Sequence, residues 1–169
     1  MDGLTTIMTR RSVRRFTDKP VDDAVVERVL RAAMAAPSAG NQQVWRFVVV
    51  HDRDVMGKLA DASPYASMLP TAPLAIVVCA EAATEKHVGF WAQDCSAATE
   101  NILLAAHALG LGAVWLGFYP VRERVEAAAE ALGLPEEVTP MSVVPLGYPK
   151  EELPAVDRYD ATYVHMDRW

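Results

Sequence analysis

Apolar side chains recur at helical spacing in several segments of the chain. In residues 22–36 the apolar positions fall on one face, Asp22 stands where a side chain can cap the first turn, and Pro37 follows where a helix must stop. We therefore expect an amphipathic helix there. The same periodicity predicts three further helices, over residues 54–62, 88–109 and 121–132.

Between these helices lie continuous apolar runs rich in β-branched residues, which are typical of strands. The run PLAIVVCA at 73–80 contains no polar side chain, so we expect it at the centre of a sheet, covered on both faces. Strands mixed with helices in this way indicate an α/β or an α+β architecture. The predicted strands comprise residues 45–51, 73–80, 113–118 and 139–149, the last with prolines near its ends.

The predicted helix 88–109 is apolar on almost every side. Between residues 90 and 110 only Asp94, Glu100 and His107 are charged or titratable. Such a helix cannot lie on the surface of a small monomer. We expect it to be both the spine of the domain and part of a subunit interface.

The composition is that of an ordinary globular protein. A chain of 169 residues is most simply one domain, residues 1–169, with 51% hydrophobic and 22% charged residues. The apolar stretch 102–118 contains Gly110, where a helix ending before a strand fits better than a membrane span. Since the N-terminus also lacks the apolar segment of a secretory signal, we expect a cytoplasmic protein with no membrane partner.

Basic residues are concentrated near the N-terminus. The formal net charge is −6, yet residues 1–20 hold five basic side chains against two acidic ones. A nucleic-acid-binding protein usually spreads its basic residues over a whole face, so we expect no nucleic-acid partner. The cluster instead indicates either a small anionic ligand or a solvated basic turn. Its arginines are Arg10, Arg11, Arg14 and Arg15.

The geometry of residues 10–16 limits what the arginines can bind. A helix would bring Arg10 and Arg14 together but would point Ser12 elsewhere. An extended segment would alternate its side chains, with Arg10, Ser12, Arg14 and Phe16 on one side and Arg11, Val13 and Arg15 on the other. At about 3.3 Å per residue, roughly 13 Å would then separate the backbones of Arg10 and Arg14. These two would contact opposite ends of one elongated anion.

Two other segments could approach a flat ligand. In PSAGNQQ (37–43) the small residues permit close backbone approach and the amides offer paired donors and acceptors, although an ordinary helix-to-strand turn explains them too. In GLGAVWLGFYP (110–120) backbone donors surround Leu116 and Gly117. Its GxG precedes a strand, so it is not a dinucleotide fingerprint.

Several kinds of active site lack support in the sequence. It contains no phosphate-binding loop, HExxH or GxSxG motif. Cys79, Cys95 and the histidines have no ligand spacing, so we expect no metal and two buried, reduced thiols. An anion clamp without an evident nucleophile indicates that a cofactor carries the chemistry.

Four motifs in register resemble those of the nitroreductase family of FMN-dependent oxidoreductases. They are RRSVRRF, PSAGNQQVWRF, DCSAATENILLAAHALGLGAVWLG and VPLGYP, followed by a terminal RYDATYVHMDRW. The resemblance runs from about residue 5 to the C-terminus. It implies an α+β fold with a central, mostly antiparallel sheet flanked by helices. It also implies an intertwined homodimer with FMN at the interface.

The resemblance also implies roles for individual residues. Arg10 and Ser12 would hold the FMN phosphate, with Arg11 and the late Arg158 nearby, and Arg14 would face the pyrimidine side of the flavin. Leu116 and Gly117 would lie near its central ring. The loop that reaches the flavin of the other subunit would contain Pro37, Ser38, Ala39 and Asn41.

The sequence departs from the family pattern at three places. Val156 occupies a position that is basic in many relatives. Tyr65 and Met68 stand where some members place an amide and a lysine by the flavin. The connection EAATEKH is too short for the helical excursion that covers the pocket of larger relatives. We therefore expect an open site, or one covered by the C-terminal tail of a partner.

The implied activity is ping-pong hydride transfer from NAD(P)H through FMN to a nitroaromatic, quinone or similar acceptor. No side chain is assigned as a catalytic acid, and Arg14 would tune the flavin electrostatically. Two alternatives stay open. One is an FMN oxidoreductase that acts on a specific metabolite by reductive dehalogenation or dehydrogenation. The other is a flavin-binding protein without turnover.

Overall fold

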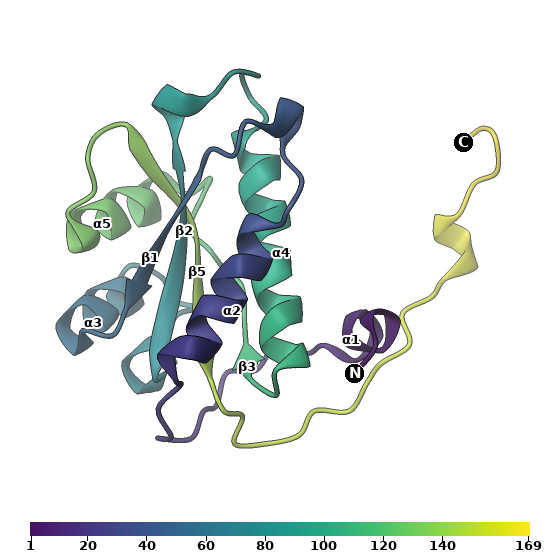
Figure 1. Ribbon diagram of the computed structural model, residues 1–169, viewed down its shortest axis with the longest axis horizontal. Helices are drawn as coiled ribbons and strands as arrows, with labels where there is room; N and C mark the ends of the chain where they lie inside the picture. Colours follow the sequence, from purple (N-terminus) through teal and green to yellow (C-terminus); the bar gives the residue numbers. More distant parts are fainter.

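A computed structural model describes residues 1–169 as one antiparallel sheet with helices on both faces (Figure 1). The strand order is β1-β2-β5-β3, and β4 also pairs with β5, so the α+β class is confirmed. The strands are β1 (Trp45–Val50), β2 (Leu74–Glu81), β3 (Gly112–Ala113), β4 (Leu116–Gly117) and β5 (Val138–Gly147). The helices are α1 (Gly3–Thr9), α2 (Asp23–Met34), α3 (Arg53–Asp61), α4 (Trp91–Ala108) and α5 (Arg122–Leu132).

Strand β2 is buried on both faces, as its continuous apolar run predicts. Successive strand side chains point to opposite faces, and here they enter two separate cores. Leu74, Ile76 and Val78 belong to the core under α2 and α4, whereas Val77 and Cys79 belong to the core under α3 and α5. Figure 1 shows these two helix pairs on opposite sides of the sheet.

Local capping explains where the helices begin. Asp22 accepts a hydrogen bond from the Ala24 N–H and starts α2, as expected. The long helix was expected to begin at residue 88, but α4 begins at Trp91 because Gly89 has a φ of +91°. A single Glu85 oxygen accepts the N–H groups of residues 89, 90 and 91. Glu85 thereby satisfies donors that a helix N-terminus leaves free.

The prolines of β5 mark two irregularities in the sheet. Pro140 stands at the register shift between β2 and β5, where a missing N–H can be accommodated. Pro145 explains why the expected strand 113–118 is instead two strands. β3 and β4 pair with β5 in one continuous register that is interrupted opposite Pro145, which has no N–H to donate.

Residues 10–17 run in extended form beside β3 and the end of β5. The Val13 N–H donates to the Ala113 carbonyl at 2.9 Å and the Thr17 N–H to the Tyr148 carbonyl at 2.8 Å. The expected strict alternation of side chains is wrong, because Val13 and Phe16 are buried in the same core. Bridges form only at Ser12 and Phe16, so no continuous ladder imposes a two-residue period on the segment between them.

Both chain ends project from the body of the molecule (Figure 1). Helix α1, which was not predicted from the sequence, begins at Gly3 after the capping residue Asp2 and exposes Leu4, Ile7 and Met8. The last nineteen residues, 151–169, are all exposed and include Tyr159, Tyr163, Met166 and Trp169. A single chain thus leaves much apolar surface uncovered at its termini. None of the helices has the length and apolar character needed to cross a membrane.

Candidate functional site

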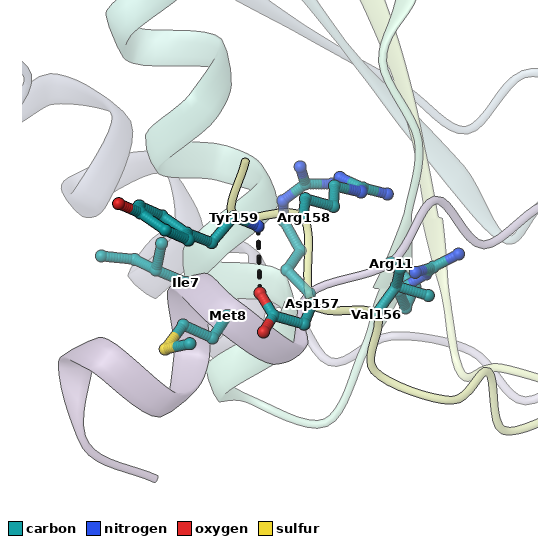
Figure 2. A pocket seen from close by; sticks show the side chains of 8 residues that line it. Ile7, Met8, Arg11, Val156, Asp157, Arg158 and Tyr159 are labelled. Carbon is teal, nitrogen blue, oxygen red and sulfur yellow. Dashed lines mark hydrogen bonds between the residues drawn. The ribbon is translucent and has the colours of Figure 1, made fainter. Parts of the chain in front are cut away.

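A cavity of about 250 Å³ lies between α1 and the C-terminal tail (Figure 2). Three arginines line it: Arg10 and Arg11 after α1, and Arg158 in the tail. Residues more than 140 positions apart thus meet at one concave surface, where the three arginines expected near the phosphate lie together. The remaining lining residues are Ile7, Met8, Val156, Asp157 and Tyr159.

Arg10 has one donor without a hydrogen bond. Its Nε is buried and forms none, although Oε1 of Glu100 on α4 lies 3.3 Å away, within ion-pair distance. The Glu100 oxygen attracts this group by charge but forms no hydrogen bond with it. Because a buried guanidinium N–H without a hydrogen bond is costly, an anionic oxygen that forms one would be favourable. This donor, with the two neighbouring arginines, fits the phosphate end of FMN.

His107 supports the segment that carries Arg10. Its Nε2 lies 2.8 Å from the Thr9 hydroxyl. Partial burial, and secondly the positive charge of Arg10, lower the pKa of His107 below its ordinary value of 6.5. The neutral imidazole is therefore favoured beside the arginine.

Asp157 is the one acidic side chain that lines this cavity. Its carboxylate accepts a hydrogen bond from the Tyr159 N–H at 3.0 Å, the dashed line in Figure 2. Three cationic side chains still outnumber one anionic side chain, so the cavity favours an anion. Val156 also lines the wall here and adds no charge.

A second cavity, of about 370 Å³, contains the residues expected near the flavin ring. Arg14, Leu116 and Gly117 all line it, and a Cβ added to Gly117 would meet no atom within 4 Å. The backbone of Gly117 is therefore open to a flat ligand. Tyr65 and Met68, which depart from the family pattern, line the same cavity together with Ser67 and Trp115.

Arg124 on α5 was not expected at this cavity. Its Nη1 donates to the Gly117 carbonyl at 3.1 Å, and its guanidinium lies 5.4 Å from the centre of the Tyr65 ring. These contacts tie the glycine segment to the wall of the cavity. An arginine on an amphipathic helix gives no signal of this role in the sequence.

The loop that follows α2 lies elsewhere. Pro37, Ser38, Ala39 and Asn41 line neither of these two cavities. Gly40, Asn41 and Gln43 have φ values of +52°, +55° and +52°, which non-glycine residues rarely adopt. Such backbone persists only where its surroundings hold it, and it is often found at functional sites.

Ser12 is half-buried and lines neither cavity. It forms a bridge with Ala113, and the neighbouring Val13 packs so closely on β3 that a Cβ on Gly112 would lie 2.6 Å from it. The Val13 side chain thus packs where any larger residue at position 112 would place its Cβ, and this contact fixes the path of residues 10–17. One chain thus presents three separate groups: the arginine cavity, the cavity beside Gly117, and the loop 37–43.

Other groups singled out in the sequence lie away from both cavities. Cys79 and Cys95 are buried and free, as expected, and burial raises the pKa of each thiol to about 12. The rings of Trp91 and Tyr119 meet edge to face with centroids 4.5 Å apart. No group of three His, Cys, Asp or Glu side chains is placed to hold a metal ion.

The family of the chain follows from comparison with known proteins. The model of the nitroreductase family matches residues 7–64 and 61–148. These ranges contain the loop 37–43, the cavity beside Gly117 and the α1 side of the arginine cavity, whose tail side lies beyond residue 148. The chain belongs to the nitroreductase family. The resemblance of its motifs to this family is thereby confirmed.

Members of the nitroreductase family are similar to the chain over nearly its whole length. A protein of Archaeoglobus fulgidus, provisionally named NADH dehydrogenase/NAD(P)H nitroreductase, is 51% identical over 170 residues, covering 98% of each chain. A solved structure with the same provisional name, from Parabacteroides distasonis, has a TM-score of 0.95 at 39% identity and covers 99% of this chain and 98% of its own. A nitroreductase-like protein of Desulfovibrio desulfuricans, solved in complex with FMN, has a TM-score of 0.86 at 33% identity, covering 100% of this chain and 98% of its own.

Proposed function

We propose that this protein is an FMN-dependent NAD(P)H oxidoreductase that reduces nitroaromatic, quinone or similar acceptors. The observation that carries the proposal is the convergence of Arg10, Arg11 and Arg158 on one cavity. The buried Nε–H of Arg10 forms no hydrogen bond there. Membership of the nitroreductase family and similarity to an FMN complex support it.

The residues divide between the two ends of an elongated cofactor. Arg10, Arg11 and Arg158, with Ser12 close by in sequence, would bind the phosphate. Arg14, Leu116 and Gly117 would contact the ring. The extended backbone of residues 10–14 supports this division, because it carries Arg10 and Arg14 to different cavities.

Bound FMN would supply the chemistry, accepting a hydride from NAD(P)H and passing it to the acceptor. The protein would bind, orient and tune this group. A guanidinium at Arg14 would stabilise negative charge that develops on the ring nearby. Neither cavity contains a histidine, and we assign no side chain as general acid.

We further propose that the working unit is a homodimer. The loop with Pro37, Ser38, Ala39 and Asn41 lines neither cavity of its own chain, so a second copy would bring it to the flavin. The exposed apolar residues of α1 and of the tail support the same assembly, since large apolar surface at both ends indicates burial against another chain.

The visible spectrum of the purified protein tests the cofactor. FMN released by heat at about one per chain, with steady NAD(P)H oxidation when menadione or a nitroaromatic is added, is the expected result. Comparing these rates with a panel of metabolites identifies the acceptor. A colourless protein that takes up no added FMN would contradict the proposal. Bound FMN without NAD(P)H turnover would support only the alternative of a flavin-binding protein that is not an enzyme.

A further inference from the structure

A buried chain of hydrogen bonds connects α4 to the loop 37–43 and to the turn before the helix. Asp94, 4% exposed, accepts from the Ala39 N–H at 2.9 Å and from Gln42 Nε2 at 2.6 Å. Gln42, 6% exposed, in turn accepts from the N–H groups of Lys86 and His87, both at 2.9 Å. The side chains of Asp94 and Gln42 therefore join helix α4, the loop 37–43 and the turn at residues 86 and 87.

The direction of these bonds is fixed by chemistry. The backbone N–H groups at both ends can only donate, and a carboxylate can only accept. Between them, the Gln42 amide must point its oxygen at residues 86 and 87 and its nitrogen at Asp94. Each group has the polarity that its neighbours require, so the chain of bonds fits one orientation only.

The segment held in this way is the strained one. Gly40, Asn41 and Gln43 all have positive φ values. Within the loop, Ser38 Oγ accepts the Gln43 N–H at 3.1 Å and the Ser38 carbonyl accepts the Asn41 N–H at 3.0 Å. These bonds close the loop on itself, whereas Asp94 fixes it to the long helix.

We propose that Asp94 and Gln42 are positioning residues for FMN binding, acting through the loop 38–41. This inference rests on the proposed function, in which the loop contacts the flavin of the second subunit. Asp94 holds the Ala39 backbone directly, and Gln42 locks the loop to the turn 86–87. Neither side chain contacts the cofactor.

The polarity of the chain of bonds makes a charge-exchange test possible. In Asp94→Asn one N–H donor always faces another, however the two amides are turned: at Ala39, between the two amides, or at residues 86 and 87. In Gln42→Glu two carboxylates meet at the 2.6 Å contact. In the double variant the amide oxygen at position 94 accepts from the Ala39 N–H, and the amide nitrogen donates to the carboxylate at position 42. That carboxylate in turn accepts from the N–H groups of residues 86 and 87. Every bond is then restored, with the charge moved from position 94 to position 42.

Two measurements on the full-length protein compare these variants with the wild type. FMN affinity is measured by quenching of flavin fluorescence, and amide hydrogen exchange of residues 37–43 and 85–88 is measured without FMN. We expect each single variant to bind FMN at least tenfold more weakly and to exchange faster, because bonds to a buried charge are lost. The double variant should return to within about threefold of wild-type affinity.

Thr99→Val serves as the matched control. Thr99 is also buried on α4, and its hydroxyl bonds Ser142 at 2.9 Å, away from the loop. Its loss should lower the unfolding temperature without changing FMN affinity or loop exchange.

Each result decides the proposal. Single variants that match the wild type would overturn it, and so would a double variant that stays impaired. If only the double variant is soluble, that rescue supports the proposal, whereas insolubility of all three overturns it. If the wild type binds no FMN, the proposed function fails while loop exchange still shows whether the bonds hold the loop.

Discussion

The Nε of Arg10 lies 3.3 Å from the Glu100 carboxylate, so the end of α1 is tied to the middle of α4 at the edge of the arginine cavity. Both side chains are partly exposed, at 21% and 42%, and the pair contributes little to the free energy of folding. Its importance is electrostatic. Glu100 orients Arg10 but places a negative charge beside the proposed phosphate position.

The first prediction concerns Glu100→Gln. Glutamine keeps an oxygen near Arg10 and removes the negative charge, so we expect FMN to bind about two- to fivefold more tightly, from about 0.5–1 kcal/mol. The gain should shrink at high salt, because screening weakens interactions between partly exposed charges. Fluorescence titration at two ionic strengths measures both effects. Weaker binding at low salt would mean that orientation of Arg10 outweighs repulsion.

Arg14 should affect reduction more than binding. In Arg14→Ala we expect FMN to remain bound, at most about tenfold more weakly, while NAD(P)H oxidation falls more than tenfold and the flavin potential becomes more negative. Arg15→Ala is the matched control, because Arg15 is exposed and pairs only with Glu151 at 3.3 Å. Unchanged turnover and potential in the Arg14 variant would refute the electrostatic role.

Much of the fold could be predicted from the sequence, because burial imposes visible patterns. The apolar run of β2 and the stripe of α2 are examples. The split at Pro145 could not be predicted, since it depends on which residue of the partner strand lies opposite the proline. Helix α1 was missed because it is only seven residues long, and the helical spacing of Leu4, Ile7 and Met8 is not repeated over a further turn.

The candidate site was predictable only in part. The extended geometry of residues 10–16 predicted that Arg10 and Arg14 would contact different parts of one ligand. The resemblance to the family motifs added Arg158 to the predicted phosphate-binding residues. The roles of Asp94 and Gln42 depend on contacts between residues more than 50 positions apart. Asp94 gave one signal in the sequence, since an acidic residue in a largely apolar helix must find a partner when it is buried.

His107 predicts how stability depends on pH. Its pKa is lowered in the folded protein, so the unfolded chain takes up a proton more readily as the pH falls through the ordinary value of 6.5. The stabilisation is therefore present above that value and is lost below it. The unfolding temperature should fall from about pH 7.5 to about pH 5.5. His107→Gln should flatten this dependence, and an equal slope in the variant would contradict the assignment.

Cys79 and Cys95 should be unreactive in the native protein. Burial raises the pKa of each thiol to about 12, and only the thiolate is an effective nucleophile. A colorimetric thiol reagent near pH 8 should therefore label neither cysteine in buffer and both in denaturant. Rapid labelling of the folded protein would show that β2 and α4 separate readily.

Truncation after Lys150 separates the stability of the body from assembly of the site. All residues of 151–169 are exposed, and the tail's only ion pair with the body joins Arg15 to Glu151 on the surface, so the shortened chain should fold with the helix content of its remaining residues. We expect it to elute as a monomer and to bind FMN at least a hundredfold more weakly, since Arg158 and the apolar tail are both lost. Arg158→Ala alone should remain dimeric while binding FMN about tenfold more weakly. A truncated protein that is still dimeric and yellow would place the subunit contact and the phosphate contact outside the tail.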